Sequence, residues 1–126
     1  MGADQFMTMA RGRTATEAFK SAVDDARHEH GHGGYTGSIA EKSRFVVIDK
    51  GEAAALAARL RAEAKKPDAD AVEITSLAKS VEAGNPEALA TALLELADRR
   101  VDDKWGPAGC IRISDDNWLF FGWASS

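Results

Sequence analysis

The amino-acid sequence predicts an α+β fold, in which a small, mostly antiparallel sheet of about four strands carries helices on one face. Three observations support this fold class. Apolar runs typical of strands occur near both ends of the chain, apolar residues at helical spacing lie between them, and polar turn residues divide the last strand-like stretch in two. With 126 residues, of which 44% are hydrophobic and 29% charged, residues 1–126 are expected to form a single domain.

The first strand and the first helix are predicted for residues 5–31. Residues 5–10 alternate loosely between apolar and polar side chains, as a half-buried strand does. Thr14 and Glu17 then form a capping-box pattern at the start of a helix. The residues that follow repeat at helical spacing and form one apolar stripe: Ala15, Ala18, Phe19, Ala22, Val23 and Ala26. Gly31 is the expected end of this helix.

A second strand and a second helix are predicted next. Residues 44–49 have a β-branched and aromatic centre with four consecutive apolar residues, which indicates a central strand covered on both faces. Asp49 can cap the following helix, which is expected to run to about Lys66 because Pro67 follows it.

Two further helices and a hairpin complete the predicted fold. Residues 70–83 favour a helix, although residues 71–75 also fit a short strand. The sequence from Gly84 to Pro86 closes one helix and starts another, whose apolar stripe comprises Leu89, Leu93, Ala97 and Val101. The runs 110–113 and 118–123 flank a polar turn and predict an antiparallel hairpin, at either the centre or the edge of the sheet.

Charge and cysteine content restrict the compartment and the partners. A net charge of −4 disfavours a broad nucleic-acid or anionic-membrane surface. The only cysteine, Cys110, suits a reducing cytoplasm, and it lies in a predicted strand, where a small buried side chain is more common than a nucleophile. The sequence shows neither a signal peptide nor a membrane-spanning apolar run, so we expect a cytoplasmic protein.

The first candidate site is the histidine cluster His28, His30 and His32. Imidazole nitrogen is a common ligand of divalent transition metals, and Asp24 or Asp25 lies about one turn earlier on the predicted helix. The alternative is an exposed helix end, where a histidine complements the helix dipole.

The second candidate is the glycine-rich loop with Tyr35, Thr36 and Ser38 as ligand-binding residues. Its backbone N–H groups and hydroxyls could hold an anion, but a Walker A loop is excluded because Lys42 comes too late in the sequence. A tight structural turn is the favoured alternative. Trp105, in a second loop, is the further ligand-binding candidate.

The third candidate is an aromatic surface on the last hairpin. Trp118, Phe120 and Trp123 are the candidate interaction residues, because exposed aromatic side chains mark partner surfaces. The competing explanation is that these residues pack in the core.

Two segments carry a resemblance to known proteins. The first comprises AFKSAV at residues 18–23 with HGHGGYTGSIAEK at residues 30–42, and the second comprises DKWGPAGC at residues 103–110 with FFGW at residues 120–123. Both resemble small, uncharacterised proteins of bacteriophages and actinobacteria. The resemblance implies a phage or prophage setting and brings no activity or catalytic residue with it.

The leading hypothesis is a small cytoplasmic, non-enzymatic binding protein, phage- or prophage-encoded and acting on a host factor through a protein partner or through self-association. The histidine loop and the Trp105 loop are expected to meet at one end of the sheet and form the binding surface. The alternative is a small metal- or nucleotide-dependent enzyme centred on residues 28–38.

Overall fold

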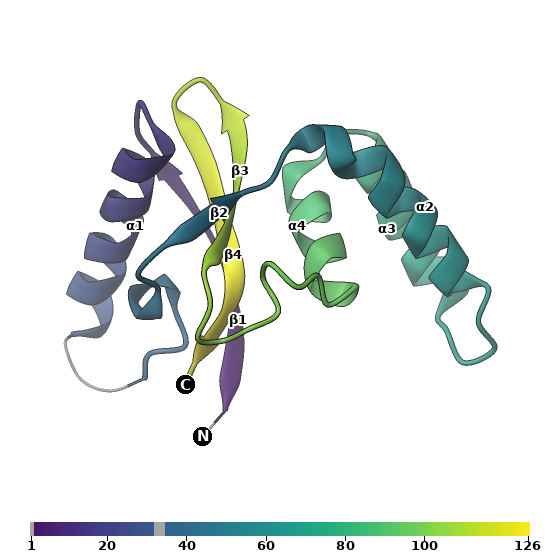
Figure 1. The fold of residues 1–126 in the computed structure, drawn as a ribbon, viewed down its shortest axis with the longest axis horizontal. Helices are drawn as coiled ribbons and strands as arrows, with labels where there is room; N and C mark the ends of the chain where they lie inside the picture. Colours follow the sequence, from purple (N-terminus) through teal and green to yellow (C-terminus); the bar gives the residue numbers. More distant parts are fainter. Residues whose placement is uncertain (1, 32–34) are drawn as a thin grey trace. The chain divides into compact units, whose positions relative to one another are not determined.

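A computed structural model describes residues 2–31 and 35–126 and confirms the α+β fold (Figure 1). Within these residues the sheet is four-stranded and mostly antiparallel, with one parallel pair of strands. The elements follow the order β1 (Ala3–Arg11), α1 (Ala15–His30), η1 (Ile39–Glu41), β2 (Phe45–Val47), η2 (Lys50–Glu52), α2 (Ala53–Ala64), α3 (Ala71–Glu82), α4 (Pro86–Glu95), β3 (Ala108–Ser114) and β4 (Asn117–Ser125).

The chain divides into two compact units. Unit 1 comprises Met1–Ile48 and Asp98–Ser126 and contains the sheet and α1. Unit 2 comprises Asp49–Ala97 and contains α2, α3 and α4. The single domain expected over residues 1–126 stays a prediction.

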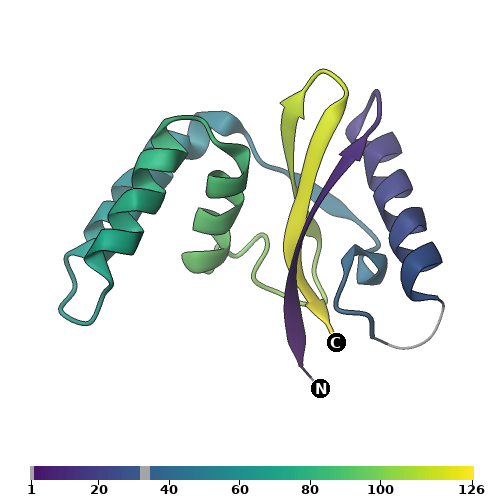
Figure 2. The same cartoon turned by 180° about the vertical axis from the view of Figure 1, so that it is seen from behind.

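The last hairpin forms the middle of the sheet. The strand order is β1-β4-β3-β2, so β4 lies between β1 and β3 and is antiparallel to both. In Figure 2, β1 runs in front of β4 along an edge of the sheet. The first and last strands of the chain are therefore hydrogen-bonded neighbours, and Gly2 and Ser126 exchange backbone bonds next to the termini.

The central position predicted for residues 44–49 is wrong. β2 is a three-residue edge strand, parallel to β3, and the Val47 side chain is 56% exposed. Phe45 packs against the core and Ile48 is buried, whereas Val47 is mostly exposed. The apolar run therefore contains both buried and exposed side chains. A run of four apolar residues cannot distinguish this arrangement from a strand that is covered on both faces.

The core of unit 1 lies between α1 and one face of the sheet (Figure 1). On this face, Phe120 contacts the rings of Phe19 in α1 and Phe45 in β2 at centroid distances of 5.5 and 5.8 Å. The predicted cap holds α1 in place, because the Thr14 hydroxyl accepts from the Glu17 N–H at 3.1 Å. As predicted, α1 ends where Gly31 takes a positive φ of 77°.

The opposite face of β3 and β4 is also apolar. Ile111, Leu119 and Phe121 are buried there, and the Phe121 ring lies directly over Gly109, where a Cβ would collide with it. Met7 and Met9 of β1 are cross-strand neighbours of Phe121 and Leu119 and so share this face. Both remain exposed, by 39% and 60%.

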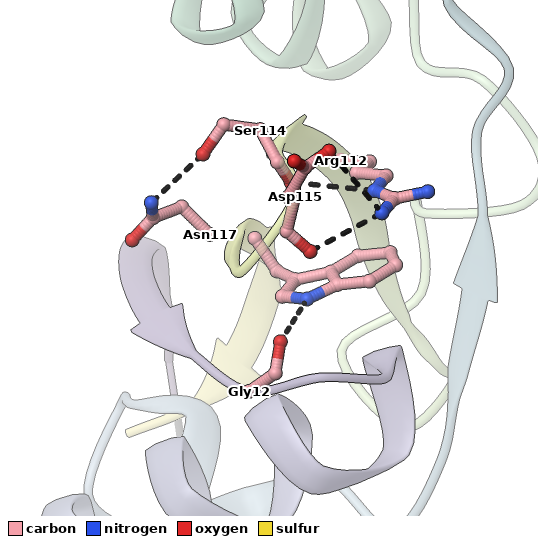
Figure 3. A network of polar contacts seen from close by, with 6 residues as sticks. Gly12, Arg112, Ser114, Asp115 and Asn117 are labelled. Carbon is pink, nitrogen blue, oxygen red and sulfur yellow. Dashed lines mark hydrogen bonds and ion pairs between the residues drawn. The ribbon is translucent and has the colours of Figure 1, made fainter.

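Polar contacts hold the end of the hairpin next to the start of α1 (Figure 3). The Trp118 indole donates through Nε1 to the Gly12 carbonyl at 2.9 Å. The Arg112 guanidinium donates to the carbonyls of Ser114 and Asp115, and lies 5.3 Å from the Trp118 ring centroid. The tryptophan is therefore part of the scaffold.

Unit 2 consists of helices with side-chain caps, of which Asp49 and Asn85 are predicted by the sequence. Asp49, Asp70 and Asn85 each accept a backbone N–H through their side chains at the starts of η2, α3 and α4. Residues 71–82 are helical, as favoured. An ion pair between Arg61 and Glu82 joins α2 to α3.

The predicted continuation of the last helix to Val101 is wrong. α4 ends at Glu95, and Ala97 takes a positive φ of 51°, which stops the helix. The apolar repeat extends beyond the helix because Val101, which is not helical, is also buried. None of the helices in the described ranges combines the length and the apolar content that a transmembrane span requires.

Candidate functional site

Two loops of unit 1 come together although they are distant in sequence. The first loop, residues 35–42, follows α1, and the second loop, residues 102–107, precedes β3. Lys42 joins them: its Nζ donates to the carbonyls of Asp103, Lys104 and Gly106 at 3.3, 3.1 and 2.9 Å. The two loops thus form one surface, as expected from the sequence.

The Lys42 side chain is only 3% exposed, which is rare for a lysine. An ammonium has three donors, and here each of them has a backbone carbonyl acceptor. Burial lowers the pKa of Lys42, and Arg44 lowers it further, whereas the nearby Asp103 carboxylate raises it. The lysine therefore acts as a buried cross-link between the loops.

The first loop is held to the sheet and to the core. The Gly37 N–H donates to the Ser125 carbonyl at 2.8 Å, and Gly37 has a φ of 68°. A Cβ at this position would lie 2.6 Å from the Asp4 carboxylate, so glycine is required there. Ile39 is buried in the core under α1.

A polar network stiffens the same loop from within. The Glu41 carboxylate accepts from the Thr36 N–H at 3.1 Å and from the Thr36 hydroxyl at 2.8 Å. Thr36 and Ser38 share a hydrogen bond of 2.7 Å between their hydroxyls, and Ser38 caps η1 by accepting from the Ala40 N–H. These side chains therefore shape the loop.

The second loop is a tight turn built on Asp103. Its carboxylate accepts from the Trp105 N–H, and its carbonyl accepts from the Gly106 N–H, both at 2.9 Å. Trp105 lies at the tip of this turn. The hydrogen bonds of the turn fix its backbone, so the indole does not have to be buried to hold the loop in place.

Tyr35 and Trp105 meet on the outside of the two loops. Their ring centroids are 5.8 Å apart, and the rings form an angle of 77°, which is an edge-to-face contact. The side chains are nevertheless 52% and 57% exposed. The Lys104 ammonium lies 5.4 Å from the Trp105 centroid, within the range of a cation–π contact.

The structure thus brings together the four residues predicted to bind a ligand, but in two layers. Tyr35 and Trp105 present exposed rings, whereas Thr36 and Ser38 are partly buried and hydrogen-bonded within their loop. We call the exposed layer the Tyr35–Trp105 pair.

The predicted metal site falls only partly within the described residues. His28 and His30 are exposed in the last turn of α1, and residues two apart on a helix point in different directions. His32 lies outside the described residues. Asp24 and Asp25 are exposed on α1, and among the residues described no group of three metal-ligating side chains comes together.

The residues predicted as an interaction surface lie on two faces of the sheet. Trp118 is 8% exposed and Phe120 is completely buried, and both belong to the core under α1. Trp123 is partly buried on the opposite face, across from Gln5. Phe120 has no surface to offer a partner, because α1 and Phe45 cover its ring.

Lys42 is the residue of the candidate site whose structural role the sequence did not indicate. In the sequence it stands out only as a lysine that comes too late for a Walker A loop. Its three acceptors lie more than sixty positions away in sequence, and each is a backbone carbonyl, so no side-chain pattern marks them. Cys110 is buried, which raises its pKa to about 12 and keeps the thiol neutral.

Comparison with known protein families, with curated proteins and with solved structures finds no match to this chain.

Proposed function

We propose that this is a non-enzymatic binding protein that engages a protein partner through the Tyr35–Trp105 pair. The supporting observation is that two large aromatic side chains, from loops seventy positions apart, contact each other while more than half of each remains exposed. Tryptophan and tyrosine are the residue types most enriched among side chains that dominate binding energy.

The support beneath the pair favours binding. Lys42 and the Asp103 turn hold the loops in one arrangement before any partner arrives. A surface that is already ordered loses less conformational entropy on binding, so more of the contact energy contributes to affinity. If the two rings served only to stabilise the fold, we would expect them to be buried, but more than half of each is exposed.

The charges around the pair are mixed. Lys104 lies against Trp105, while Asp102 and Asp103 are exposed in the same loop. An apolar centre with a polar rim of both signs is the usual composition of a protein–protein surface. The acidic net charge and the resemblance to phage and actinobacterial proteins support a cytoplasmic, phage-related setting with a host protein as partner.

The enzyme hypothesis receives less support from the loop geometry. The Thr36 N–H and hydroxyl, which would have to bind a phosphate, already donate to the Glu41 carboxylate. A phosphate would have to displace that carboxylate and would be repelled by its charge.

The test is a quantitative pulldown from an actinobacterial lysate with three immobilised proteins. These are the wild type, Trp105→Ala, and Val72→Ala as a control that removes an 82% exposed apolar side chain of α3. We expect a partner that the wild type and the control retain equally and that Trp105→Ala loses. Purified with that partner, Trp105→Ala should weaken binding by roughly thirtyfold, the size of a strong interface residue.

A partner that Trp105→Ala retains at full affinity contradicts the proposal, and so does a wild type that captures no protein specifically. Melting curves of the variants provide the folding control, because both substitutions remove exposed side chains.

A further inference from the structure

Among the residues of unit 1 that the structure describes, no strand pairs with the outer edge of β1. β1 has nine residues, it pairs with β4 on one side only, and its register with β4 runs without interruption from Ala3 to Arg11. In Figure 2 no other segment of unit 1 lies over this edge. The strand contains no proline, lysine or bulge, which commonly block such an edge, and its two charged residues, Asp4 and Arg11, lie near its ends.

The hydrogen bonds at the two ends of β1 show which backbone groups point outward. Gly2 exchanges bonds with Ser126, and the Gly12 N–H donates to the Asp116 carbonyl. Because antiparallel pairs alternate between bonded and non-bonded positions, the even-numbered residues between them bond to β4. The N–H and C=O groups that face away from the sheet belong to Ala3, Gln5, Met7, Met9 and Arg11.

These outward groups are complementary to themselves. If a second β1 runs antiparallel with Met7 opposite Met7, then Gln5 meets Met9 and Ala3 meets Arg11. Every outward residue then faces another outward residue, so each pair exchanges two backbone bonds. A shift of one residue would set outward groups against inward ones, and a shift of two would leave groups at the ends without partners.

Side chains favour the same arrangement. Met7 and Met9 are 39% and 60% exposed and share one face of the strand. In the joined sheets Met7 would pack against Met7 of the other copy, and Met9 would lie diagonally across from that same side chain. In the antiparallel direction Arg11 lies opposite the uncharged Ala3 of the other copy, whereas a parallel direction centred on Met7 would set Arg11 beside Arg11 and Asp4 beside Asp4.

We propose that two copies of this chain pair through the outer edges of β1, antiparallel and centred on Met7, so that the two sheets form one continuous sheet. The contact is isologous, so it closes as a dimer and leaves no further β1 edge exposed. It does not depend on the Tyr35–Trp105 pair, and each proposal can fail without the other.

Cysteine cross-linking tests both the edge and the register. In the proposed dimer the Cα atoms of Met7 in the two copies are separated by about 5.5 Å, a distance that a disulfide can span. Met9 is matched to Gln5 of the other copy, so the two Met9 positions lie roughly 13 Å apart along the strands. The native Cys110 is fully buried and does not compete for oxidation.

We expect Met7→Cys to form a disulfide-linked dimer rapidly under mild oxidation and Met9→Cys to remain largely monomeric. Met9 is the more exposed residue, so random collisions would give the reverse order. A mixture of Gln5→Cys with Met9→Cys should give the heterodimer. Equal or faster cross-linking of Met9→Cys overturns the proposed register.

A backbone variant tests the contact without cross-linking. Met7→Pro removes an N–H that faces away from β4, so the β1–β4 ladder stays intact, whereas Met7→Ala removes the same side chain and keeps the N–H. By sedimentation velocity we expect a wild-type dimer and a dissociation constant at least tenfold higher for Met7→Pro than for Met7→Ala. A wild type that remains monomeric at high concentration overturns the proposal, as does a dimer that Met7→Pro leaves unchanged.

Discussion

Trp118 and Phe120 of the last hairpin are buried, whereas Tyr35 and Trp105 of the two loops are exposed. Trp118 and Phe120 lie in the core under α1, where Phe120 contacts two further rings. Tyr35 and Trp105 contact each other on the protein surface, on two loops that the buried Lys42 joins. In sequence, both groups are aromatic residues next to glycines and polar turns.

The comparison shows that the structural position of an aromatic residue, in the sheet or in a surface turn, decides whether its ring is buried. Phe120 lies on a strand that is paired on both sides, and its ring points to the face of the sheet that α1 covers. Trp105 is at the tip of a turn that is held by backbone contacts, so its ring has no packing role to fulfil. The hairpin aromatics should therefore control stability, and the loop aromatics should control binding.

The largest effect is expected for Phe120→Ala. Removing a completely buried ring leaves a cavity between α1, β2 and β4, and the free energy of unfolding should fall by about 3–5 kcal/mol. Urea denaturation followed by circular dichroism measures this change. The matched variant Trp105→Ala should lose less than about 1 kcal/mol, because its side chain is mostly exposed. Similar losses for the two variants would contradict the division between core and surface.

A smaller effect is expected for Lys42→Met, which keeps much of the side-chain volume and removes the charged donor. Three backbone carbonyls lose their partner, so the free energy of unfolding should fall by about 2–3 kcal/mol. Hydrogen exchange should show faster opening of residues 102–107. Lys104→Met, which removes a more exposed lysine from the same turn, should change stability by less than about 1 kcal/mol. Equal effects would show that Lys42 does not join the loops.

The smallest effect is the coupling between Tyr35 and Trp105. A double-mutant cycle with Tyr35→Ala and Trp105→Ala should give a coupling of roughly 0.5 kcal/mol in unfolding, at the lower end for an edge-to-face pair because both rings are solvated. A coupling several times larger would mean that the pair stabilises the fold, and the contrast with Phe120 would weaken.

Local signals in the sequence predicted local structure well. The Thr14 cap, the Gly31 end of α1, the Asn85–Pro86 start of α4 and the final hairpin are all present, because each depends on residues within a few positions of one another. The positive φ of Gly37 is a local feature that glycine permits, whereas the close approach of Asp4 to this residue depends on the tertiary structure. The histidine loop and the Trp105 loop were expected to meet, and residues 35–42 do so, but no local signal specified the contacts that join the two loops.

Tertiary structure alone decided the strand order, the burial of the hairpin aromatics and the tether between the loops. β2 became an edge strand because β4 pairs with β1 from the other end of the chain, and no periodicity within residues 44–49 records that pairing. Lys42 became a buried cross-link because folding brings three carbonyls to it. The sequence therefore determined most of the elements and the caps that start them, because these depend on side chains close together in the chain. A backbone carbonyl is the same in every residue, so only the fold could determine which distant groups meet.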